Sequence, residues 1–148
     1  MDADNTVSRS LHDLGLAAWF GGSLMGAVGL NGAAAQVEEP RQRLRVADAG
    51  WNRWTPVNLA GIVAHVAGGA VLLGANKGRV AGQQGVASAT VVKTALTGAA
   101  LAATAWSRAL GAKLDQAGEV PVEGSTEPSV ATPTTWPRPS GSSGCCNG

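Results

Sequence analysis

The sequence is poor in charged side chains, and long parts of it contain none. Only 14% of its 148 residues are Asp, Glu, Lys or Arg, against about 25% in soluble proteins. Residues 14–37 and 54–76 carry no formal charge, and Lys93 alone interrupts residues 80–107. Since about 20 helical residues cross about 30 Å of hydrocarbon, each stretch is long enough to span a membrane.

Missing motifs argue against several chemistries. Carboxylates occur only toward the termini and around residues 38–48, so no pair is expected inside the predicted bundle for acid–base catalysis. There is no GxxxxGK[ST] phosphate-binding loop. The net charge is +1, without the clustered basic face that phosphate contacts need. We therefore expect no enzyme, no cofactor and no binding to nucleic acid.

The apolar stretches predict an all-α transmembrane bundle over residues 1–118, followed by a disordered polar tail at 119–148. The three spans are placed at about residues 11–35, 55–77 and 88–111. A soluble Ala/Gly-rich bundle is the alternative, but it would show a regular polar face. A cleaved export signal is a second alternative, although the acidic amino-terminal region has the wrong charge for one.

Capping patterns place the ends of the spans. Ser10 and Asp13 fit a capping box, so the first span should begin near Leu11. Thr55 can cap the second span with Pro56 in its first turn. The third span has weaker signals, which are Ser88 at its start and Gly111 or Gly118 at its end.

Basic residues near the spans predict the orientation, because Lys and Arg are retained on the cytoplasmic side. Six lie on one side and three on the other: Arg41, Arg43, Arg45, Arg53, Arg108 and Lys113 against Arg9, Lys77 and Arg79. The first loop is therefore placed inside and the amino terminus outside. Residues 40–54 fit either a short interfacial helix or a solvated loop. Trp51, Trp54 and Trp106 are expected together at the inner headgroup level, with Lys93 extending outward from the outer half.

Small residues recur at helical spacing in every span, as close helix packing in lipid requires. The first span includes the GxxxG pair Gly22 and Gly26. The stripes of small residues are Gly15, Ala18, Gly22, Gly26, Gly29 and Ala33; Gly61, Ala64, Gly68 and Ala75; and Thr94, Gly98, Ala102, Ala105 and Ala109. They fit an ordinary compact bundle, and they leave open whether some stripes face another subunit or a second copy.

Polar residues at membrane depth are functional candidates because they are costly there. His65 lies near the middle of the second span, and Met25 is expected to approach its level. A His/Met pair suits a soft ion such as Cu(I), although two ligands are few. The simpler reading is a neutral His65 hydrogen-bonded to a neighbouring helix. His12 is expected about one leaflet away from His65, so the two histidines should not share a metal.

The end of the chain changes character at Trp136. Residues 120–135 form an acidic Pro/Thr/Ser linker of a disordered kind. The following WPRPSGSSGCCNG has no helical period, and its Cys145 and Cys146 could be acylated near a membrane. The other hypothesis is a reading-frame shift, because one back-translation gives the start of a basic amphipathic helix in the neighbouring frame. In that case a fourth span is lost.

Two segments carry a resemblance, LHDLGLAAWFGGSLMGAVGLN at residues 11–31 and RVADAGWNRWTPVN at residues 45–58. They resemble small uncharacterised multi-pass membrane proteins of actinobacteria. The opening helix is also similar to that of the copper-resistance D-like group in His12, Trp19, Gly21 and Gly22. The resemblance implies a four-span bundle of unknown activity. Its copper association depends on ligands that this chain mostly lacks.

Two functions from different classes follow. The favoured one is a non-enzymatic structural or accessory component of a bacterial inner-membrane assembly, with the lipid bilayer and other membrane subunits as partners. The alternative is a small carrier or metal/ion-handling membrane protein that uses His65 and Met25.

Overall fold

The computed structural model describes residues 3–117, 120–124, 127 and 129–130. The predictions for Gly118 and for the chain from Trp136 onward, including both cysteines and the lost span, lie outside these residues. So does most of the predicted tail at 119–148.

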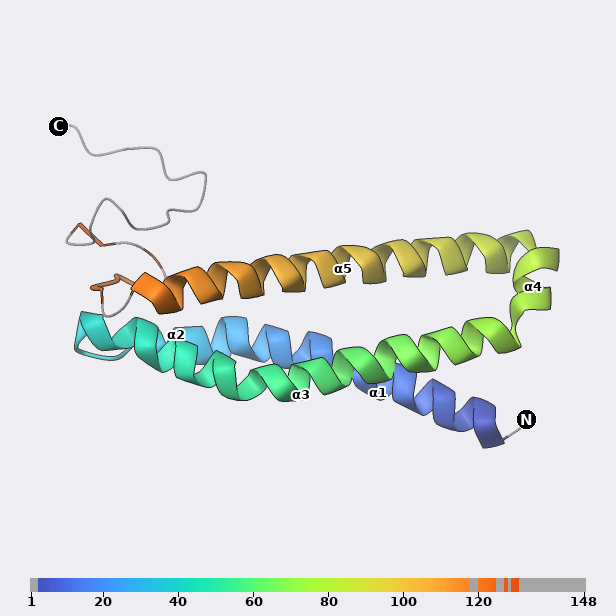
Figure 1. Cartoon of the computed structure of the whole chain (residues 1–148), viewed down its shortest axis with the longest axis horizontal. Helices are drawn as coiled ribbons and strands as arrows, with labels where there is room; N and C mark the ends of the chain where they lie inside the picture. Colours follow the sequence, from blue (N-terminus) through green and yellow to red (C-terminus); the bar gives the residue numbers. More distant parts are fainter. Residues whose placement is uncertain (1–2, 118–119, 125–126, 128, 131–148) are drawn as a thin grey trace.

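Helices make up almost all of the described chain, which confirms the all-α prediction (Figure 1). The long helices are α1 (Ala3–Met25), α3 (Pro40–Ala75) and α5 (Gln84–Ala117). A π-helical turn, η1 (Gly26–Leu30), joins α1 to α2 (Asn31–Ala35), and the short α4 (Lys77–Gly82) connects α3 to α5. Three segments are long and apolar enough to cross a membrane, as predicted: Asn5–Ala35, Pro40–Ala75 and Gln84–Leu114.

The first helix begins earlier than the predicted start near Leu11. α1 already runs from Ala3, so Ser10 and Asp13 lie inside it and the capping-box prediction is wrong. Residues 3–9 contain neither Gly nor Pro, and nothing there interrupts the helical hydrogen bonds. Every residue of α1 therefore lies deeper in its helix than the sequence pattern indicated.

The second long helix also begins earlier than predicted, at Pro40. Its start has the pattern expected at Thr55 and Pro56, a capping side chain followed by proline. Glu39 has extended backbone angles and its side chain accepts a hydrogen bond from the Arg41 amide at 3.3 Å, with Pro40 in the first turn. Pro56 lies inside α3, and the Thr55 hydroxyl donates to the Trp51 carbonyl at 2.9 Å. The predicted cap at Thr55 is therefore wrong. Residues 40–54 are neither a separate interfacial helix nor a loop.

The third long helix extends past its predicted start at Ser88 and past the possible stop at Gly111. It starts at Gln84, and the Ser88 hydroxyl donates to the Gly85 carbonyl within the helix at 3.2 Å instead of capping it. It continues through Gly111 to Ala117. A lone glycine in a long apolar helix costs only about 1 kcal/mol, which is too little to end it.

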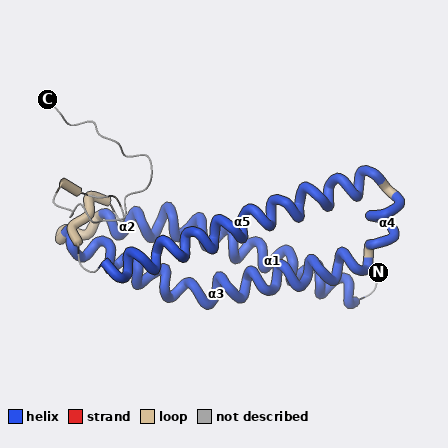
Figure 2. Tube along the Cα trace, turned by 45° about the horizontal axis from the view of Figure 1, so that its top comes forward, coloured by secondary structure: helices blue, strands red, loops and turns tan. Residues whose placement is uncertain are grey.

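The long helices are unequally packed (Figure 2). α1 and α3 are in close contact along much of their length, whereas α5 makes its main backbone contacts with the short α4. None of the apolar stretch of α5 that qualifies as a span is buried. The molecule is a tight antiparallel pair, α1 and α3, with a third helix beside it.

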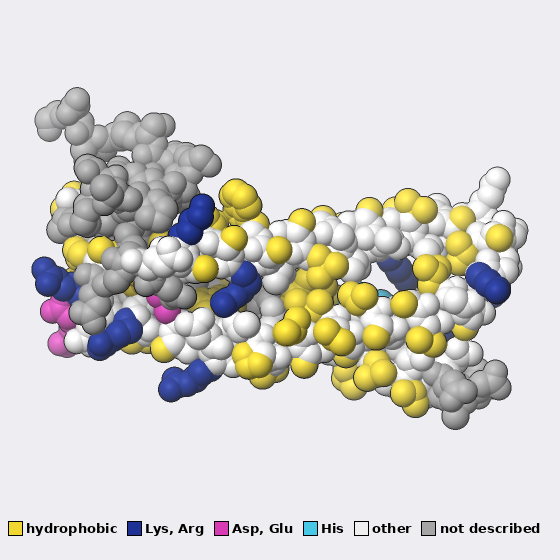
Figure 3. Space-filling model, in the orientation of Figure 1, with side chains coloured by type: hydrophobic (Ala, Val, Ile, Leu, Met, Phe, Trp, Pro, Cys, Tyr) yellow, Lys and Arg dark blue, Asp and Glu magenta, His cyan; other side chains and the backbone are white. Residues whose placement is uncertain are grey.

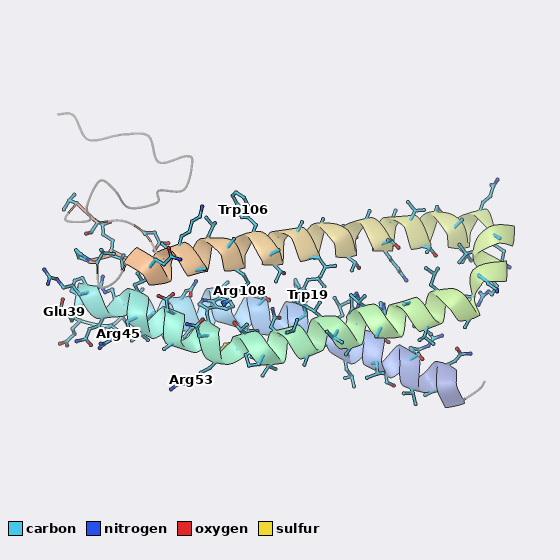
Figure 4. The ribbon with its side chains drawn as sticks, viewed as in Figure 1. Trp19, Glu39, Arg45, Arg53, Trp106 and Arg108 are labelled. Atoms are coloured by element: carbon cyan, nitrogen blue, oxygen red, sulfur yellow. The ribbon has the colours of Figure 1, made fainter. Side chains whose placement is uncertain are left out.

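The tryptophans predicted at one headgroup level have different surroundings in the structure. Trp51 lies against Gly26 and donates from its indole to the Asn31 side chain at 2.9 Å, while Trp54 lies against Gly22. Both rings therefore pack between helices, in space that the missing glycine side chains leave. Trp106 is 68% exposed and points away from the bundle (Figure 4).

A small apolar cluster fastens the segment after α5 to the start of α3. Val122 is fully buried against Leu44, and its amide donates to the Pro40 carbonyl at 3.4 Å. The Arg43 side chain donates to the Val37 carbonyl at 2.7 Å and to the Val122 carbonyl at 3.4 Å. These contacts attach the segment after α5 to the start of α3 at this end of the bundle.

Candidate functional site

The centre of the molecule is the crossing of α1 and α3, where two helices approach at glycine. A Cβ on Gly15 would stand 2.5 Å from the His65 amide nitrogen and 2.6 Å from the Gly61 carbonyl oxygen. A Cβ on Gly68 would stand 2.5 Å from the Ser8 carbonyl oxygen. Because both neighbours are backbone, a larger residue would push the helices apart. The sequence placed these glycines on interfaces without showing which helix each would meet.

Two histidines meet at this crossing and bind each other's backbone. The rings of His12 and His65 are stacked, with centroids 4.0 Å apart and planes 19° apart. His12 Nδ1 lies 2.9 Å from the His65 carbonyl oxygen, and His65 Nδ1 lies 2.9 Å from the His12 carbonyl oxygen. Since a carbonyl only accepts, both rings carry their proton on Nδ1. In a neutral ring with this tautomer, Nε2 is the acceptor.

The prediction that His12 lies about one leaflet from His65 is wrong. It depended on a first helix starting near Leu11, which would place His12 at the helix mouth. With α1 starting at Ala3, His12 lies well inside the helix and reaches the level of His65. The one feature that could have revealed this is the uninterrupted helix-compatible sequence before Ser10.

The predicted pairing of His65 with Met25 is not formed. Met25 follows His12 by 13 residues on the same helix, which corresponds to about 20 Å along the axis. Its side chain is 66% exposed and contacts Gly29 of its own segment. His65, by contrast, is only 4% exposed.

The histidine pair is also poorly arranged for a shared metal ion. An imidazole nitrogen binds a metal in the plane of its ring at about 2.0 Å, and two stacked rings with centroids 4.0 Å apart do not direct their nitrogens at one point. Among the described residues no group of three or more His, Cys, Asp or Glu side chains is placed to hold a metal. The arrangement acts as a hydrogen-bonded clamp between α1 and α3.

A row of threonines on α5 faces the clamp. The Thr97 hydroxyl lies 3.5 Å from His65 Nε2, and the Trp19 indole donates to the Thr104 hydroxyl at 3.1 Å. Thr90 and Thr94 continue the row toward α4. Their spacing puts all four on one helix face. Sequence reasoning missed this row, although the spacing was visible.

A cavity of about 490 Å³ lies between this row and the α1–α3 pair. Its floor is the histidine pair, and Lys93 lines it, although that side chain was expected to extend outward. Basic and histidine atoms are visible in the hollow between α5 and the helices below it (Figure 3). The other polar and charged residues of its wall include Arg9, Asp13, Asn76 and Arg79.

The remaining predicted packing residues behave differently from one another. Gly22 and Gly26 accommodate tryptophan rings instead of a neighbouring helix backbone. A Cβ on Gly98 of α5 would meet no atom within 4 Å. From Gly98 onward, the small stripe of the third span is thus not an interface within the described chain, whereas its Thr94 belongs to the threonine row.

Comparison with known proteins does not identify this site. No family model matches the chain, and neither curated proteins nor solved structures give a significant match. Any function must therefore be argued from the residues themselves.

Proposed function

We propose that the chain is a non-enzymatic structural or accessory component of a bacterial inner-membrane assembly. The observation that supports this is the uncovered small-residue face of α5. Four exposed residues form it, at intervals of four, three and four: Gly98, Ala102, Ala105 and Ala109. In lipid, where apolar surface alone does not drive helices together, such a face permits the close approach on which helix association depends.

The α5 face differs from ordinary lipid-facing surface in its lack of bulk. The opposite side of α5 carries the large exposed Leu96, at 65% exposure. The clamp face of the same helix is already occupied by the threonine row. A helix from another membrane subunit, or from a second copy, would fit the remaining face. The chain would then act by holding that partner.

Bulk added to this face tests the proposal. Gly98→Leu with Ala102→Leu keeps the surface apolar but blocks close approach. Ala100→Leu with Ala103→Leu adds two leucines to the opposite, equally exposed side of α5 and is the matched control. Tagged proteins would be crosslinked in bacterial membranes, purified, and analysed for a subunit present at a fixed ratio.

We expect wild type and control to retain the subunit and the Gly98/Ala102 variant to lose it. Recovery of all three proteins as monomers would contradict the accessory role. Retention of the subunit by all three would contradict the assignment to this face.

The cavity favours a second candidate, a small carrier or ion-handling protein. It would use His65 and Lys93, both in the cavity wall, and not Met25. Elemental analysis of detergent-purified protein separates the two candidates. Stoichiometric metal that is lost in His65→Ala would favour the carrier and displace the accessory role.

A further inference from the structure

We infer that the cavity between α5 and the α1–α3 pair binds an anionic phospholipid, with its phosphate among Arg9, Arg79 and Lys93. This inference goes beyond the proposed function and does not depend on it, because it concerns what the isolated chain holds from the bilayer itself. Three features of the cavity carry it: its charge, its apolar lining and its opening.

The charge of the cavity wall is unbalanced. Arg9 of α1, Arg79 of α4 and Lys93 of α5 all line it, against the single carboxylate of Asp13. All three side chains are exposed, and within the described part of the chain none of these side chains forms a hydrogen bond or ion pair with another residue. Phosphate oxygens accept strong charge-assisted hydrogen bonds from Arg and Lys, so an anionic headgroup would supply the missing partner.

The apolar part of the wall identifies the anion as part of an amphiphile. Val66, Leu73 and Val86 line the same cavity as the cations. Free phosphate would leave these side chains without a partner, whereas acyl chains would cover them. The hydroxyls of Thr90 and Thr94, which also face the cavity, are additional donors for the headgroup.

A second copy of the chain is less suited to this cavity than lipid. Between residues 14 and 114 its only carboxylates are Glu38, Glu39 and Asp48. They lie around the α2–α3 connection, at the opposite end of the bundle from α4 (Figure 1). At the α4 end, the carboxylates of a neighbouring copy are confined to its first 13 residues, and Asp13 already lines that copy's own cavity. Lipid, in contrast, reaches the cavity from the side, because α5 is not packed closely on α1 or α3.

Spin-labelled lipids in reconstituted vesicles test this inference. Electron paramagnetic resonance measures the protein's preference for labelled phosphatidylglycerol over labelled phosphatidylcholine. Arg79→Gln with Lys93→Gln removes two cavity charges. Arg53→Gln with Arg108→Gln removes two exposed charges elsewhere and is the matched control (Figure 4). Arg79→Lys with Lys93→Arg keeps the charge and tests folding of the altered site.

One juxtamembrane cation contributes about fivefold to binding of an anionic lipid. We therefore expect the wild-type preference for phosphatidylglycerol to fall at least about fivefold in the Arg79/Lys93 Gln variant. The control and the charge-keeping variant should retain it.

Three results would overturn the inference. The first is no preference in wild type, and the second is an equal loss in the cavity variant and its control, which would indicate general surface attraction. The third is displacement of the labelled lipid by inorganic phosphate alone, which would indicate a site for a free anion.

Discussion

The α1–α3 crossing and α5 are made from the same small residues, yet only the crossing is covered. Gly15 leaves no room for a Cβ because the backbone of α3 lies against it, while a Cβ on Gly98 would meet nothing within 4 Å. The difference shows what small-residue spacing means in a membrane helix. It indicates that another helix can approach closely, but it does not identify which helix does so.

The polar side chains also differ between the crossing and α5 in how fully they are hydrogen-bonded. At the crossing, each ring of the His12–His65 clamp finds the other residue's carbonyl. On α5, the threonines form only two contacts to the pair, one of them at 3.5 Å, and part of their row faces the cavity. Regions with few contacts open at lower free-energy cost than well-packed ones. We therefore expect α5 to separate before α1 and α3 do.

The largest effect is expected from Gly15→Ala. Its Cβ would overlap the backbone of His65 and Gly61, and overpacking of this kind costs about 3 kcal/mol. Gly98→Ala is the control, and it should leave stability unchanged or raise it by up to about 1 kcal/mol, because alanine is the better helix former. Unfolding of both in mixed micelles gives the comparison. Equal stability of the two variants would remove the distinction between the crossing and α5.

His65→Leu should have the next largest effect. It removes the bond to the His12 carbonyl and the stacked ring at a site only 4% exposed, for a loss of about 2 kcal/mol. Thr97→Val removes only the 3.5 Å contact to the same ring and should cost about 0.5 kcal/mol. The same unfolding measurement applies. A loss in Thr97→Val as large as in His65→Leu would mean that α5 is part of the clamp.

Arg43→Gln should release the segment that follows α5. The side chain bridges the Val37 and Val122 carbonyls, and its loss should cost about 1 kcal/mol locally. Hydrogen exchange at the Val122 amide should become faster, while Arg41→Gln, which changes an exposed neighbour, should leave it unaltered. Unchanged exchange in both variants would show that Val122 is held by apolar burial alone.

Thr104→Val should have a small effect, comparable to that of Thr97→Val. It removes the hydrogen bond from the Trp19 indole, which joins α5 to α1, and interhelical bonds in membranes average about 0.6 kcal/mol. Ser107→Ala, at an exposed position on the same helix, is the reference. A cost above about 2 kcal/mol would place α5 in the tightly packed core.

The sequence predicted the spans well and their ends poorly. Long uncharged runs require helices in lipid because every backbone group must be satisfied internally. Helix ends depend on competing signals, and the Glu39–Pro40 start prevailed over the equally good Thr55–Pro56 pattern. A proline inside α3 is tolerated in a membrane helix because neighbouring groups satisfy the freed carbonyl.

The site was predicted only in part, for a related reason. His65 and Lys93 were predicted as candidates because a polar residue in a membrane span is energetically costly and stands out in an apolar sequence. The partner of His65 was not predicted, because a first helix that starts near Leu11 places His12 at the helix end and not at the level of His65. Pairing between helices depends on register, and register depends on the loops and ends that the periodic pattern leaves open.

Distances measured by double electron–electron resonance in lipid nanodiscs show how tightly each of the three long helices is held. With both native cysteines replaced, spin labels at the exposed positions Phe20 and Val63 report on α1 and α3, and labels at Val63 and Leu96 report on α3 and α5. We expect a narrow distance distribution for the first pair and a clearly broader one for the second. Equally narrow distributions for both would contradict a tight α1–α3 pair with a loosely held third helix.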